Sequence, residues 1–76
     1  NQNGTRISLK TEDKIGVLED ITNEFVKHNC NITNLGVYDL EDNCKNLIFR
    51  TNAEDTTALE NELKEKGYEI LDTRKC

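Results

Sequence analysis

The sequence predicts an α+β domain of the ferredoxin-like type, in which a four-stranded antiparallel sheet carries two helices on one face. Two observations support this fold class. Strand-like and helix-like segments follow one another in the order strand, helix, strand, strand, helix, strand. This βαββαβ order is that of two interlocked strand–helix–strand crossovers. The length of 76 residues suits one domain with a single small core, for which a partner surface would be a useful addition.

The first strand is expected from Thr5 to Lys10, where polar and apolar residues alternate and Ile7 and Leu9 share one face. We interpret residues 1–76 as one domain with an ordered core over residues 5–75. Because the chain begins with Asn rather than Met, it is interpreted as a fragment or processed form. Its residues 1–4 are then expected to be a solvated lead-in.

The first helix is expected from Gly16 to His28, because its apolar residues recur at helical spacing, at Val17, Leu18, Ile21 and Phe25. It should end at Asn29, since asparagine tolerates the left-handed conformation of the residue that follows a helix. Cys30 then lies where it can contact Phe25 across the last turn.

Two further strands are expected from Ile32 to Asp39 and from Cys44 to Thr51, joined by the polar hairpin loop Leu40–Asn43. The second of them alternates regularly. In the first, the apolar residues change parity, which predicts a bulge near Asn34, and Gly36 allows a close approach to the backbone.

The second helix is expected to begin at a cap formed by Asp55 and to bury Ala58, Leu59 and Leu63. Gly67 should end it in a left-handed turn that places Tyr68 against Leu63. The last strand, Tyr68 to Arg74, follows without a linker.

The strand order of this topology is fourth, first, third, second, so the second and fourth strands are the edges. The fourth carries Glu69, Asp72, Arg74 and Lys75, which protect an edge, whereas residues 30–38 in the second carry no charge. We therefore expect the second strand to pair with its own copy or with a sister domain, through Ile32, Asn34, Leu35, Gly36, Val37 and Tyr38. The alternative is a short edge covered by the chain that precedes Asn1 in the full protein.

Charge and composition exclude several classes of function. The formal net charge of −5 argues against binding to nucleic acid or to anionic membranes, and the sequence has no apolar run long enough to span a bilayer. The three cysteines lack metal-site spacing and are expected to be free thiols, which indicates a reducing, cytoplasmic location. The acidic loop over residues 11–14 argues against an acylphosphatase-like hydrolase, and no cofactor or metal is expected.

The start of the first helix is the expected ligand site. Backbone N–H groups and the partial positive charge of a helix N-terminus suit a carboxylate or a phosphate. Gly16 and the N–H groups of Val17 and Leu18 could bind a ligand carboxylate, with Asp13 holding an ammonium. The alternative is that Asp13 caps the helix and uses the same donors.

His28 is interpreted as a cation near the end of the first helix, with no cysteine or carboxylate placed to partner it. The charged run from Glu60 to Lys66 is interpreted as a solvated helix face and not as a metal site.

The order of elements, the loop Asp13–Leu18 and the pair Asn31-Ile32 resemble the ACT domain, a small regulatory module of amino-acid metabolism. The resemblance covers residues 6–74. Three shorter pieces resemble more particularly the ACT tail of bacterial CBS-pair proteins of the acetoin-utilisation type: Val37–Asp39, Leu47–Arg50 and Lys66–Leu71.

The resemblance implies a non-catalytic domain that pairs side by side and binds a small effector, typically an amino acid, at the interface. Carried over by position, the site comprises Thr11, Asp13 and Gly16 of the loop together with Asn31 of the partner, and its neighbourhood adds Ile15, Val17 and Leu18. Two positions depart from the family pattern: Ile15 replaces a proline, and Asp13 replaces a neutral amide. The expected function is allosteric signalling to an attached domain; the alternative is a pure association module without a ligand.

Overall fold

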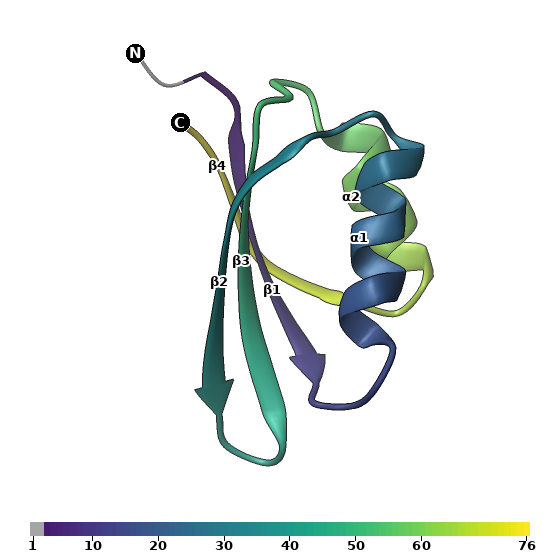
Figure 1. Ribbon diagram of the computed structural model, residues 1–76, viewed down its shortest axis with the longest axis vertical. Helices are drawn as coiled ribbons and strands as arrows, with labels where there is room; N and C mark the ends of the chain where they lie inside the picture. Colours follow the sequence, from purple (N-terminus) through teal and green to yellow (C-terminus); the bar gives the residue numbers. More distant parts are fainter. Residues whose placement is uncertain (1–2) are drawn as a thin grey trace.

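The computed structural model describes residues 3–76, which form a four-stranded sheet with both helices on one face (Figure 1). The strand order is β2-β3-β1-β4, and all three strand pairs are antiparallel. The elements are, in chain order, β1 (Thr5–Glu12), α1 (Val17–Lys27), β2 (Ile32–Leu40), β3 (Cys44–Thr51), α2 (Thr57–Glu65) and β4 (Glu69–Lys75). The predicted fold class, element order and strand order are therefore confirmed.

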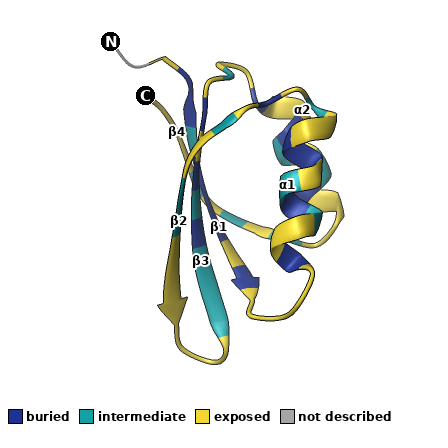
Figure 2. Cartoon of the chain, viewed as in Figure 1, coloured by how far each residue is buried: buried dark blue, intermediate teal, exposed yellow. Residues whose placement is uncertain are grey.

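The core lies between the helices and the central strands β1 and β3, where buried residues concentrate (Figure 2). The rings of Phe25 in α1 and Phe49 in β3 stack with their centroids 4.7 Å apart. Around this pair are the other buried apolar residues, Ile7, Leu9, Val17, Ile21, Cys30, Leu47, Leu59 and Leu63. Neither helix within residues 3–76 is long and apolar enough to cross a membrane.

Both helices end in the left-handed turns that the sequence predicts. Asn29 has a φ angle of 59°, and the N–H of Cys30 donates to the carbonyl of Phe25 at 2.8 Å. Gly67 has a φ angle of 97°, and the N–H of Tyr68 donates to the carbonyl of Leu63 at 3.1 Å. These bonds satisfy carbonyls that would otherwise lack partners at a helix end.

The irregularity predicted near Asn34 is confirmed, because the β2–β3 register shifts between Ile32 and Asn34. Gly36 has the predicted close approach, made by the ring of Tyr38 in the same strand. A Cβ atom added at Gly36 would lie only 2.7 Å from that ring.

The first strand is two residues longer than predicted and includes Thr11 and Glu12, which pair with Lys45 and Cys44. The strand continues because Thr11 is buried on the helix-facing side, so the inward–outward alternation does not end at Lys10.

The predicted solvated lead-in is wrong at Gly4, whereas residues 1–2 lie outside the described part of the chain. Gly4 is buried, and its carbonyl accepts the N–H of Cys76 at 3.0 Å. Its φ angle is 122°, and a Cβ atom there would lie 2.1 Å from the backbone oxygen of Thr51. The sequence contained no sign of this, since the close approach arises from the packing of distant segments.

Candidate functional site

The loop between β1 and α1 is anchored at one end and turned sharply at the other. The N–H of Asp13 donates to the carbonyl of Asn43 in the β2–β3 hairpin at 2.9 Å. Gly16 forms the N-cap of α1 with φ 91°, a left-handed conformation that favours glycine. Between them, the side chain of Ile15 is fully exposed. The backbone of the loop is thus tied to the hairpin at Asp13, and the loop projects Ile15 outward.

Asp13 does not cap α1, so that alternative is wrong. Within residues 3–76, its carboxylate accepts no hydrogen bond from the first turn of the helix and lies instead 3.9 Å from the Nζ atom of Lys45 in β3. The anchored backbone and the left-handed turn at Gly16 direct the Asp13 side chain toward the sheet. Consequently, no side chain caps the N–H groups at the start of α1 among the described residues, although the N–H of Val17 donates to the backbone carbonyl of Lys14 at 3.4 Å.

A hollow of about 130 Å³ lies between this loop and the strands β2 and β3. Four of the residues expected at the ligand site line it: Thr11, Asp13, Val17 and Leu18. Val37 of β2 and Leu47 of β3 complete its apolar wall. The structure thus brings most of the loop residues together around one cavity, with Ile15 and Gly16 outside its lining.

Lys45 also lines the hollow, and sequence reasoning missed its role. Its ammonium forms an ion pair with Asp39 and approaches Asp13, and the hydrogen bond to Asp39 raises the pKa of Lys45. Lys45 shares a strand face with Leu47 and Phe49, and this alternation was the signal that could have placed it beside the loop. The lining of the hollow therefore contains two pairs of opposite charge within 4 Å, Lys45 with Asp13 and the more exposed Lys14 with Glu12.

Asn31 does not join the loop residues within one chain. It lines a different hollow at the opposite end of α1, together with Phe25, Cys30 and Ile32. Its backbone carbonyl accepts the N–H of Asn52 at 3.2 Å, which fixes the start of β2. A role for Asn31 at the loop therefore requires a second copy of the chain.

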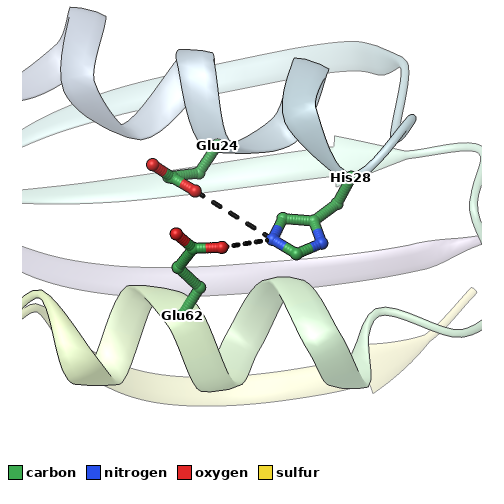
Figure 3. Close-up of side chains that lie close together, drawn as sticks. All are labelled: Glu24, His28 and Glu62. Atoms are coloured by element: carbon green, nitrogen blue, oxygen red, sulfur yellow. Dashed lines mark hydrogen bonds and ion pairs between the residues drawn. The ribbon is translucent and has the colours of Figure 1, made fainter.

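A second group of titratable side chains lies between the helices. Contrary to the sequence interpretation, His28 has carboxylate partners: its Nε2 atom is 2.7 Å from Glu62 of α2 and 4.0 Å from Glu24 of α1 (Figure 3). Hydrogen bonds from Lys27 and then His28 lower the pKa of Glu62 from 4.5 to about 2. The i,i+4 spacing of Glu24 and His28 was a visible signal for half of this cluster.

At the other end of the helix pair, Tyr68 is half-buried against the core. Its hydroxyl donates to Asp20, and burial together with this bond raises the pKa of Tyr68 to about 12. Lys66 forms an ion pair with the same carboxylate at 2.6 Å. These contacts join the first turn of α1 to the end of α2.

Comparison with known proteins identifies the class of this domain. A family model described as the TTHA0829-like ACT domain matches residues 3–74, and the chain belongs to this family. An ACT domain protein from Streptococcus pneumoniae has the same fold, with a TM-score of 0.73 and 18% sequence identity over 99% of this chain and 91% of that chain. No curated protein gave a significant match. The predicted resemblance to ACT domains, which are in general regulatory, ligand-binding and non-catalytic modules, is confirmed.

Proposed function

We propose that this ACT domain binds an amino acid at an interface between two copies, or between it and a sister domain, and thereby signals to an attached domain. The observation that carries the proposal is the hollow beside the β1–α1 loop. It combines an ammonium from Lys45, a carboxylate from Asp13 and helix-start N–H groups that no side chain caps, and it lies beside the edge strand β2, which carries no charge before Asp39.

The polar groups of the hollow suit a zwitterion. A ligand carboxylate fits beside the Lys45 ammonium and the first-turn N–H groups of α1, and a ligand ammonium fits beside Asp13. Hydrogen bonds to charged groups are the stronger ones, so these contacts provide both affinity and orientation.

The edge strand β2 provides the second half of the site. Val37 and Tyr38 are 50% and 56% exposed, and no residue from 30 to 38 is charged. If two β2 strands pair antiparallel about Asn34, Asn31, which directly precedes β2 in one copy, approaches the part of β2 around Val37 in the other. Because Val37 lines the hollow, this pairing would bring the amide of Asn31 to the ligand.

The mechanism is linkage between ligand binding and domain pairing. A ligand that contacts both copies binds the paired arrangement more tightly than the separated one, so it shifts the population toward pairing. An attached domain responds when its own geometry differs between the two arrangements.

The test is calorimetric titration and thermal shift with a panel of amino acids at millimolar concentration. We expect binding by one or two amino acids, and Lys45→Gln should weaken that binding by about 10-fold or more through loss of a charge-assisted hydrogen bond. Lys64→Gln, the same change on the exposed face of α2, is the control and should leave the affinity unchanged. No response to any member of the panel would refute the ligand-binding proposal.

The second candidate is an association module that pairs through β2 and binds no ligand. The proximity of Lys45 to both Asp13 and Asp39 favours it, because these groups already satisfy one another. Light scattering that shows a dimer, combined with a flat amino-acid panel, would support this candidate. A monomer at high concentration would contradict both candidates.

A further inference from the structure

A cluster of metal-ligating side chains lies between α1 and α2, away from the proposed amino-acid site. Figure 3 shows that Glu24, His28 and Glu62 point toward one another from the two helices. The Nε2 atom of His28 is 2.7 Å from Oε1 of Glu62 and 4.0 Å from Oε1 of Glu24. One ligand atom from each residue lies within 4.8 Å of the other two.

The Oε1 atom of Glu24 is the independent sign of a missing partner. The side chain is only 9% exposed, and within residues 3–76 this oxygen is buried without a hydrogen bond. A buried carboxylate oxygen that lacks a donor is costly, so the arrangement calls for a cation or a proton at this point. Two cationic groups face this oxygen, His28 Nε2 and Lys27 Nζ, and both are 4.0 Å away, too far for a hydrogen bond.

The other oxygens of the two carboxylates are already paired with lysines. Lys27 lies 2.7 Å from Oε2 of Glu62, and Lys66 lies 3.2 Å from Oε2 of Glu24. This pairing fixes the orientation of both carboxylates, so their Oε1 atoms face the imidazole of His28. Groups that bond to the outer atoms of metal ligands commonly orient such sites.

We propose that Glu24, His28 and Glu62 form a site for a Zn²⁺ ion that bridges α1 and α2. Zn²⁺ binds imidazole nitrogen and carboxylate oxygen at about 2.0–2.2 Å, which places tetrahedral ligand atoms roughly 3.3 Å apart. The Nε2–Oε1 distances of 2.7 and 4.0 Å lie on either side of that value, so small side-chain rotations close the site around an ion. Water supplies the fourth ligand.

The donor set selects the class of metal. A neutral imidazole suits Zn²⁺ and its neighbours among the transition metals, whereas Mg²⁺ and Ca²⁺ prefer sites built from oxygen alone. Bound Zn²⁺ would link two helices from different halves of the chain, and it would stabilise the folded domain by mass action. The domain would thus respond to Zn²⁺ independently of the amino acid.

The single histidine of the chain makes the test direct. The tag-free protein is titrated with ZnCl₂ at neutral pH, followed by calorimetry and by the NMR signals of the His28 ring. We expect one Zn²⁺ per chain, displaced ring signals and a raised unfolding temperature, with no such displacement by MgCl₂. His28→Gln and Glu62→Gln should each weaken binding by about 10-fold or more. Glu65→Gln, the same change at an exposed position of α2, should leave binding unchanged.

The thiols of Cys44 and Cys76 could also bind Zn²⁺. A Cys44→Ser/Cys76→Ser variant therefore separates binding by these thiols from binding by the site between the helices. Zn²⁺ affinity retained in this variant supports the helix site, and affinity lost with it overturns the proposal. Unmoved His28 signals in the unsubstituted protein would overturn it as well, whether or not the substituted chains fold. Equal weakening by Glu65→Gln and Glu62→Gln would show a general charge effect and would also contradict the site.

Discussion

At the scale of single residues, two glycines show what local sequence can and cannot predict. Gly67 follows a helical pattern and precedes a strand, so its left-handed conformation was expected from its position alone. Gly4 adopts its φ of 122° because the backbone of Thr51, far along the chain, lies against it. No local pattern records such a contact, and for this reason Gly4 was mistaken for part of a solvated segment.

Gly4→Ala is expected to lower the free energy of unfolding by about 2 kcal/mol or more, through the cost of a left-handed non-glycine residue and a clash with a backbone oxygen. Gly67→Ala is the matched control, because its φ is also positive but no atom lies within 4 Å of the added Cβ. It should cost only about 1 kcal/mol. Urea unfolding followed by far-UV circular dichroism measures both, and equal losses would contradict the packing role of Gly4.

At the scale of elements, periodicity identified which face of each helix is buried but not which residues meet across the helix pair. Glu62 and His28 are 34 residues apart, and their contact depends on how α1 and α2 pack together. The same limit applies to the candidate site. Asp13 was predicted from the start of the helix and Thr11 from the resemblance to ACT domains, whereas Lys45 lies at the site through the β1–β3 register, in which it pairs with Thr11.

The helix pair should make stability depend on acid pH. The pKa of Glu62 is lowered in the folded state from 4.5 to about 2, so its contribution to stability is present above pH 4.5 and is lost as the pH falls toward 2. In Glu62→Gln, the urea midpoint should therefore fall less steeply as the pH is lowered from 4.5 toward 2. Some slope remains, because the pKa values of Asp20 and Asp55 are lowered too. Glu65→Gln, as a control, should keep the full slope, and an unchanged slope in Glu62→Gln would contradict the prediction.

The loss of folding stability at alkaline pH should depend on Tyr68. Its folded-state pKa is raised from 10.0 to about 12, so the protonated hydroxyl contributes stability that is present below pH 10 and is lost as the pH rises toward 12. Tyr68→Phe should reduce this alkaline loss. It should also remove a small part of the acid slope, because the hydrogen bond from Tyr68 helps to lower the pKa of Asp20. Urea midpoints measured from pH 8 to 11.5 test this, and a loss in Tyr68→Phe as steep as in the unsubstituted chain would disprove it. Lys66, whose pKa is also raised, accounts for a remaining slope.

At the scale of the whole molecule, the two edges of the sheet differ in a way that the sequence already indicated. The strand order confirms that β2 and β4 are the edges. Asp72 of β4 forms a salt bridge with Arg74 at 2.8 Å, whereas β2 and the two residues before it carry no charge until Asp39, near the end of the strand. An edge that carries charges resists pairing and an uncharged one permits it. The sequence does not predict the residue about which two β2 strands would pair, because that register depends on contacts between two copies.

Asn34→Glu should weaken pairing without unfolding the domain. Residue 34 pairs with Arg50 in the β2–β3 ladder, so a glutamate there gains a cation within its own chain. In a dimer centred at residue 34, two glutamates would face each other across the axis, and like charges directly opposite are destabilising.

We expect the dimer dissociation constant, measured by analytical ultracentrifugation at low salt, to rise by about 10-fold or more in Asn34→Glu. Asn61→Glu, the same substitution on the exposed face of α2, adds equal charge away from the edge and should leave the constant unchanged. If both variants weaken the dimer equally, net charge rather than the β2 edge controls association, and if neither does, the chains pair elsewhere.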